Sequence, residues 1–253
     1  MSARQLSIPG RPKPYVMAHR GNSAACPENT LAAFRRALAD GADIIETDLH
    51  LTADGVFVCI HDGEVDRTTD GHGAVAAMTL AQVKTLSASY GRPEFAAERV
   101  PTLAELCDLL VRKAPGVALA LELKTDRFLE LDVCRKLADE LAAAGVLDRT
   151  VALSFALARV QAMAAAAPDM PKGFITMSKL TPKGVDAQLI GAFWPVYFLN
   201  PFYVRQAHAA GQITCPLDPT PDGRLWYYRW LGCDAVLAND PAATIRALGR
   251  GVA

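Results

Sequence analysis

The stretch ADIIETDLHLTADGVFVCIHDG, residues 42–63, begins as a buried strand and then places two acids within it. Ile44 and Ile45 are apolar strand residues, whereas Glu46 and Asp48 follow one residue apart. Alternate residues of a strand share a face, so the two carboxylates point the same way. Carboxylates that share a buried face repel each other and are costly to remove from water. A bound cation would offset that cost, so the pattern predicts a metal site.

Short apolar runs alternate with longer amphipathic runs along the rest of the chain. Eight apolar runs are predicted strands, at residues 15–19, 43–49, 117–124, 150–155, 173–177, 196–200, 212–217 and 234–239. Helical patterns separate most of them, which is typical of a parallel sheet covered by helices. Eight such strands in 253 residues fit an α/β fold of the (β/α)₈ TIM-barrel type. A doubly wound open sheet is the alternative, but AHRGNSAACPEN is not the glycine-rich phosphate turn expected after its first strand.

The spacing of the predicted strands also indicates the domain organisation. We expect a single domain over residues 1–253, because the strands and helices alternate throughout the chain. Residues 62–116 interrupt that alternation and carry RTTDGHGAV and two helical patterns. This segment is predicted to be an insertion over the barrel mouth.

The composition of the chain indicates which binding partners and which cellular compartment to expect. The chain is 51% hydrophobic and 21% charged, as in ordinary globular proteins, and its net charge of −1 argues against a nucleic-acid partner. We see neither a signal peptide nor a run of roughly 20 apolar residues that would span a bilayer. We therefore expect a cytoplasmic protein whose six scattered cysteines are reduced and packed. The oligomeric state is left open.

Polar residues stand where the first three predicted strands end. In a TIM barrel, chemistry sits at the carboxyl ends of the strands. The residues found there are His19 and Arg20, then Glu46 and Asp48, then Glu122 and Lys124. Three carboxylates from neighbouring strands are therefore expected to converge.

A hairpin signal brings one more residue to this cluster. Asp54-Gly55 favours a two-residue turn. If these two residues form the turn centre, residues whose numbers sum to 109 pair across the hairpin. Asp48 then lies opposite His61, and the spacing predicts that His61 joins the acids.

The assembled residue types point to one reaction class. Glu46, Asp48 and Glu122 offer only oxygen ligands, which suit Mg²⁺ or Ca²⁺ better than zinc or copper. Arg20 and Lys124 beside a cation make an anion site, and phosphate is the natural guest. The two histidines, His19 and His61, suit general acid–base catalysis near neutral pH. Metal-assisted cleavage of a small phosphodiester follows.

The ordered motifs of the chain closely resemble the glycerophosphodiester phosphodiesterase family. The matching residues are His19-Arg20-Gly21, Pro27-Glu28-Asn29-Thr30, Glu46 with Asp48, Thr52 with Asp54-Gly55, and His61-Asp62, followed by RTTDGHG, PTLAEL, ELK and GCDAVLANDP. The resemblance covers most of the chain. It implies a TIM barrel with a small insertion after the second strand, and hydrolysis of glycerophosphodiesters to sn-glycerol 3-phosphate and an alcohol.

The resemblance also implies the role of each candidate residue. The family's metal ligands fall on Glu46, Asp48 and Glu122, its acid–base histidines on His19 and His61, and its phosphate contacts on Arg20 and Lys124. In this family the glycerol 2-hydroxyl is thought to attack first, giving a cyclic phosphate that water opens. The chain departs from the family near the seventh strand, where ITCPLDPTPDG lacks the aromatic residue of a frequent Trp-Thr pair.

Two other interpretations of the same residues stay open. One keeps the barrel and its centre but acts on a lipid head group, as a lysophospholipase D or sphingomyelinase D. The other is a catalytically inactive anion-binding module, against which the intact set of acids and histidines argues. A glycosidase is weaker still, because paired carboxylates alone would serve it.

Overall fold

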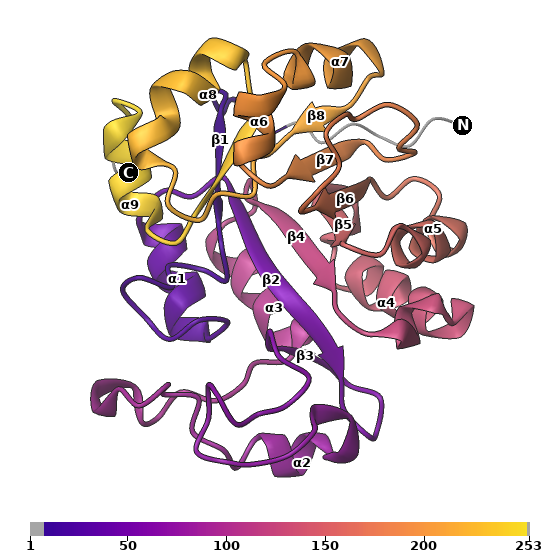
Figure 1. The fold of residues 1–253 in the computed structure, drawn as a ribbon. Helices are drawn as coiled ribbons and strands as arrows, with labels where there is room; N and C mark the ends of the chain where they lie inside the picture. Colours follow the sequence, from indigo (N-terminus) through magenta and orange to yellow (C-terminus); the bar gives the residue numbers. More distant parts are fainter. Residues whose placement is uncertain (1–7, 252–253) are drawn as a thin grey trace.

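The computed structural model describes residues 8–251 and shows a nearly closed barrel of eight parallel strands with helices outside it (Figure 1). The sheet order is β8-β7-β6-β5-β4-β2-β1-β9, and β3 pairs with β2 outside this path. The strands are β1 (Tyr15–Ala18), β2 (Ile44–Leu51), β3 (Phe57–Cys59), β4 (Ala118–Leu123), β5 (Thr150–Ser154), β6 (Lys172–Thr176), β7 (Leu189–Ala192), β8 (Ile213–Thr214) and β9 (Ala235–Ala238). The predicted TIM barrel is confirmed.

Helices follow most strands and cover the outside of the barrel. They are α1 (Leu31–Ala39), α2 (Leu80–Val83), α3 (Leu103–Lys113), α4 (Leu131–Ala143), α5 (Leu157–Ala166), α6 (Pro195–Leu199), α7 (Tyr203–Ala209), α8 (Leu225–Leu231) and α9 (Pro241–Ala247). Short 3₁₀ turns occupy Val75–Ala77, Pro93–Phe95, Asp126–Leu129, Leu147–Arg149 and Asp222–Arg224. Thr30 and Thr102 begin α1 and α3 as N-caps, and Thr102 forms a capping box with Glu105.

Strand alternation sorts β4 into an inner and an outer face. Leu119, Leu121 and Leu123 are fully buried in the hydrophobic layer between the sheet and α3 and α4. Ala118 and Ala120 instead belong to the cluster inside the barrel. This alternation carries on to Glu122, which therefore faces the interior near the mouth.

The barrel has one seam, between β8 and β9, where the residues described show no strand pairing. The backbone N–H of Asp234 donates to the Thr214 carbonyl at 3.1 Å, and that of Asn239 donates to the Pro219 carbonyl at 2.8 Å. The Asp234 carboxylate also accepts hydrogen bonds from the Thr214 backbone and from His208. Hydrogen bonds to the Asp234 side chain thus replace part of the missing strand pairing between β8 and β9.

One predicted strand is wrong. Residues 196–200 lie in and just after α6, and the strand at this point of the barrel is β7 (Leu189–Ala192). A short apolar run cannot distinguish a strand from a helical turn, and Pro195 at the first turn of α6 was the overlooked start signal.

On β7, Gly191 lies where a Cβ would approach Ile175 to 2.9 Å, so the strand needs a residue without a side chain at this position.

The hairpin of β2 and β3 differs from its prediction by one residue. His50 pairs with Val58 and Leu51 with Phe57, so paired numbers sum to 108, and Asp48 lies opposite Ile60. The reason is a three-residue loop that ends in Gly55 at φ +74°, a conformation that favours glycine. The predicted pairing of Asp48 with His61 is therefore wrong.

The predicted insertion at residues 62–116 divides into two parts by its packing. Val65, Val75 and Val83 are buried in a small cluster that they share with Val58 and Ile60. The later part, α3, packs in the layer that surrounds the barrel. Figure 1 shows the earlier part as a lobe beyond the end of β2, where β3 and α2 lie.

The six cysteines are buried and unpaired, as expected for reduced, packed side chains. Among residues 8–251, no helix is both long and apolar enough to cross a bilayer.

Candidate active site

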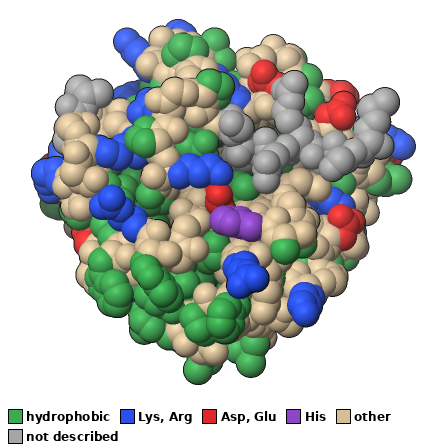
Figure 2. Space-filling view, turned by 90° about the horizontal axis from the view of Figure 1, so that it is seen from above, with side chains coloured by type: hydrophobic (Ala, Val, Ile, Leu, Met, Phe, Trp, Pro, Cys, Tyr) green, Lys and Arg blue, Asp and Glu red, His purple; other side chains and the backbone are tan. Residues whose placement is uncertain are grey.

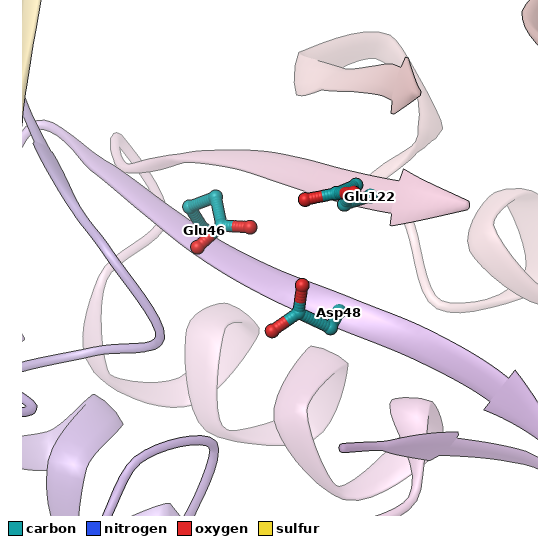
Figure 3. Close-up of side chains that lie close together, drawn as sticks. All are labelled: Glu46, Asp48 and Glu122. Carbon is teal, nitrogen blue, oxygen red and sulfur yellow. The ribbon is translucent and has the colours of Figure 1, made fainter. Parts of the chain in front are cut away.

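The three predicted metal ligands come together at the mouth of the barrel. Glu46 and Asp48 project from β2 and Glu122 from β4, and their carboxylates point toward one another (Figure 3). The register that pairs Asp48 with Glu122 places them side by side on neighbouring strands. One oxygen of each carboxylate lies within 4.8 Å of the others, so the three could hold a metal ion. All three side chains are buried.

Burial and mutual repulsion disturb the titration of these acids. Desolvation, with the charges of Asp48 and Glu122, raises the pKa of Glu46 well above its ordinary value. Desolvation likewise raises the pKa of Glu122. Desolvation opposes ionisation of Asp48 too, but the cations of Lys124 and Arg20 outweigh it and lower the pKa of Asp48. Full ionisation of all three acids is therefore unfavourable without a further positive charge beside them.

Lys124 and Arg20 lie against the acids, as predicted. The Lys124 ammonium is 2.7 Å from Glu122 Oε1 and 3.2 Å from Asp48 Oδ1. Burial disfavours the charged lysine, but Asp48 and Glu122 outweigh it and raise its pKa. Arg20 Nε lies 3.2 Å from Asp48 Oδ2. Both cations border a cavity at the barrel mouth, where they can meet an anion.

The His-Arg-Gly motif is a tight turn that aims its backbone at the acids. Arg20 has a φ of +57° and Gly21 of +78°. A Cβ on Gly21 would come within 2.6 Å of the Ala33 backbone, so glycine is required there. The turn lets the Arg20 backbone N–H donate to Glu46 Oε2 at 2.9 Å.

His19, at the end of β1, has a neutral partner. Its Nδ1 donates to Asn239 Oδ1 at 2.7 Å, which leaves Nε2 as an acceptor. Burial, aided by the Arg20 charge, lowers the pKa of His19 to about 4. His19 is therefore a neutral imidazole with one free lone pair.

His61 has a charged partner instead. Its Nδ1 donates to Asp62 Oδ1 at 2.6 Å, and the carboxylate can stabilise positive charge on the ring. The His61 carbonyl also accepts from His50 Nε2 at 3.1 Å. Although the hairpin register differs from its prediction, His61 lines the same cavity as His19, Glu46 and Glu122, because β3 ends two residues before it.

Arg67, from the lobe after β3, links the two sides of the site. Its Nε donates to Asp62 at 2.5 Å, and its Nη2 donates to Glu28 at 2.7 Å. Glu28 in turn accepts from Arg20 at 3.0 Å. The Arg67 hydrogen bond, with the added pull of His61, lowers the pKa of Asp62 to about 2. A continuous chain of charges thus runs from Arg20 to His61.

Asn29 lies just before α1 but contacts an acid of the cluster in place of capping the helix. The N-cap of α1 is Thr30, whereas Asn29 has a φ of +56° and donates to Asp48 Oδ2 at 2.8 Å. Thr47 fixes the amide by donating to Asn29 Oδ1 at 2.7 Å. Sequence patterns alone assign no role to Asn29, Asn239 or Arg67. The positions of Asn29 and Arg67 inside the PENT and RTTDGHG motifs could have indicated that they belong to the site.

The cavity at this mouth has a volume of about 170 Å³. The polar residues that line it are Glu46, Glu122, His19, His61, Arg20 and Lys124. The opposite wall is apolar and is formed by Leu153, Phe155, Ile175, Leu189, Cys215, Leu217 and Leu237. A ligand here therefore meets a charged side and an apolar side.

Known proteins share this sequence and this fold. The sequence model of the glycerophosphoryl diester phosphodiesterase family matches residues 19–243. The chain belongs to this family. It is accordingly a phosphoric diester hydrolase, as its motifs predicted.

Individual relatives cover almost the whole chain. The glycerophosphodiester phosphodiesterase of Caldanaerobacter subterraneus subsp. tengcongensis is 38% identical over 94% of this chain and 99% of its own length. An Oleispira antarctica phosphodiesterase, solved with the product sn-glycerol 3-phosphate, is 28% identical, with a TM-score of 0.84 over 93% of this chain and 97% of that one. The enzyme from Agrobacterium tumefaciens is 27% identical, with a TM-score of 0.79 over 92% and 99% of the two chains.

Proposed function

We propose that this enzyme hydrolyses glycerophosphodiesters to sn-glycerol 3-phosphate and an alcohol, with a divalent cation on Glu46, Asp48 and Glu122. The observation that carries the proposal is the cluster of three buried carboxylates, two of which line one cavity together with two differently partnered histidines. The Oleispira antarctica relative holds sn-glycerol 3-phosphate, which supports the same product here.

The acidic residues fit a hard cation. All the ligand atoms are carboxylate oxygens, which both Mg²⁺ and Ca²⁺ prefer. Asp48 Oδ1 is buried and, among the residues described, makes no hydrogen bond of good geometry, although Lys124 lies nearby. When bound, the cation supplies positive charge that polarises the phosphoryl group.

The histidine partners assign the two proton transfers. His19, neutral and with Nε2 free, accepts the proton of the attacking hydroxyl. His61, which Asp62 orients through Nδ1, donates a proton to the leaving alcohol oxygen. Arg20 and Lys124 bind the phosphate oxygens and hold the diester in place. When the glycerol 2-hydroxyl attacks, a cyclic phosphate forms, and water opens it with the two roles reversed.

Product analysis with glycerophosphocholine tests the proposal. Expected products are sn-glycerol 3-phosphate and choline in equal amounts; phosphocholine and glycerol would contradict it. The analogue that lacks the 2-hydroxyl tests the first attack separately. It should not be turned over, and cleavage at the native rate would mean that water attacks directly.

The apolar cavity wall favours a second candidate substrate, a lysophospholipid such as lysophosphatidylcholine. Leu153, Ile175 and Leu217 offer an acyl chain surface that a deacylated diester leaves uncovered. The enzyme would then be a lysophospholipase D. Comparing kcat/KM on lysophosphatidylcholine and glycerophosphocholine decides between the two substrates.

Replacing Arg67 by alanine should lower kcat by about 10- to 100-fold, with KM nearly unchanged. Arg67 holds Asp62, which orients His61, but it does not line the cavity. Steady-state kinetics on glycerophosphocholine measure the effect. Arg99→Ala, an arginine of the same lobe that bonds only nearby carbonyls, is the matched control. Equal activity of the two variants would remove Arg67 from the positioning of His61.

A further inference from the structure

An exposed aromatic surface lies beside the mouth of the barrel. Leu199, Phe202, Trp226 and Trp230 on and around α6, α7 and α8 are 61 to 72% exposed, and Leu180 and Phe198 are also exposed. We call these six residues the aromatic face. Hydrophobic side chains gather toward one edge of the surface in Figure 2, which looks down on α6, α7 and α8. Isolated exposed apolar residues are ordinary, but a group of this kind marks an interaction site.

Ring contacts make the aromatic face continuous. Phe198 and Trp230 both stack on Tyr227, with centroids 4.3 and 5.7 Å away. Asn200 donates to the Leu180 carbonyl at 3.0 Å, which joins the loop after β6 to the end of α6. The rings are thus held in position before anything binds them.

The aromatic face reaches the catalytic cavity. Trp194 packs edge-on against Phe198 with centroids 5.9 Å apart, and its backbone N–H donates to the carbonyl of Leu217. Leu217 lines the cavity, as does the exposed Phe155. An apolar path therefore connects the aromatic face with the apolar wall of the active site.

Most charged side chains around the aromatic face are positive, although Asp222 lies just before α8. Between Lys172 and Asp218 the sequence has one acid, Asp186, which pairs with Lys172 at 2.5 Å. Lys179, Lys183 and Arg205 in this segment, and Arg229 on α8, have no ion-pair partner within residues 8–251. Exposed tryptophan beside unpaired lysine and arginine suits the boundary of an anionic bilayer.

We infer that the aromatic face docks on an anionic phospholipid surface and presents the active-site mouth to it. A second copy of the chain is the competing occupant. A two-fold contact through this face would set Arg205 and Arg229 near their own copies, so positive charge would face positive charge. Docking does not depend on which bond the enzyme cleaves, so it can fail while the proposed function holds.

Vesicle sedimentation tests the inference. The full chain should co-sediment with vesicles of equal parts phosphatidylcholine and phosphatidylglycerol, and much less with phosphatidylcholine alone. Trp226→Ala/Trp230→Ala should weaken the partitioning at least about tenfold, because two large apolar side chains no longer insert. Arg205→Glu should weaken it at least about fivefold on the anionic vesicles.

Controls separate docking from misfolding and from self-association. Val111→Ala/Leu131→Ala removes two exposed apolar residues of α3 and α4 and should bind as the native chain does. The tryptophan variant should cleave soluble glycerophosphocholine at the native rate. Native-like vesicle binding by the tryptophan variant, or no binding by the native chain, would overturn the inference. So would a native dimer in solution that the tryptophan substitutions convert to a monomer.

Discussion

Replacing His61 by alanine is expected to lower kcat on glycerophosphocholine by about 10²- to 10⁴-fold, the usual worth of a positioned general acid. Asp62 accepts a hydrogen bond from Nδ1 of His61 and so orients the ring for this proton transfer. A water molecule in place of the ring would not be oriented in this way, so it would donate the proton less well. His19→Ala should have an effect of the same order, because its free Nε2 would be the base. Initial rates of sn-glycerol 3-phosphate release measure both.

The histidine variants need a control for folding. His72 is 88% exposed, bonds to Asp66 in the lobe, and lies outside the cavity, so His72→Ala should keep native activity. All three variants should melt close to the native temperature, because each substitution removes one hydrogen bond between side chains, to Asn239, Asp62 or Asp66. An unfolded His61→Ala protein, or one with native turnover, would show that the residue is not the acid.

Removing the divalent cation is expected to lower activity by about three orders of magnitude, since a metal ion supplies several kcal/mol of transition-state stabilisation. Chelation leaves Glu46, Asp48 and Glu122 facing one another, so it should also lower the melting temperature. Restoring the cation at about 100 times its dissociation constant should stabilise the fold by about 2.7 kcal/mol. Activity assays and thermal melts with Mg²⁺ or Ca²⁺ measure the two effects.

Glu122→Gln distinguishes a metal ligand from a structural acid. The amide keeps the shape of the side chain but removes one charge, so the variant should lose most activity and its melting temperature should hardly respond to the cation. Asp139→Asn, an exposed acid on α4, is the matched control and should behave as the native enzyme. Full activity of carefully chelated native enzyme would exclude the cation from the mechanism.

The convergence of acids could be predicted from sequence because strand periodicity fixes it. Glu46 and Asp48 share a face whatever the surroundings, and the parallel alternation places Glu122 at the same edge. Where local patterns were ambiguous, prediction failed. Residues 196–200 are apolar enough for a strand but lie in and just after α6, and the loop at Asp54-Gly55 has one residue more than assumed.

The residues that orient the catalytic groups were harder to predict than the groups themselves. Asn239 reaches His19 across 220 positions, and Arg67 reaches Glu28 across 39. No periodic pattern in the sequence indicates either contact, because each depends on how distant loops meet after folding. Asn29 stands beside a helix start, where asparagine is ordinarily a cap, so its residue type does not indicate the contact with Asp48; Thr30 is the cap here.

At the seam between β8 and β9, side-chain hydrogen bonds stand in place of a continuous backbone ladder. Asp234 fastens the seam through Thr214, His208 and Lys13, and these partners overcome the effect of burial to lower its pKa. The strands on the two sides of this seam also contribute to the apolar wall of the cavity, through Leu217 just after β8 and Leu237 on β9. The acids on β2 and β4 stand on strands held by an unbroken register. The weaker closure of the barrel therefore lies on the apolar side of the cavity, in the arc opposite the residues proposed to bind the cation.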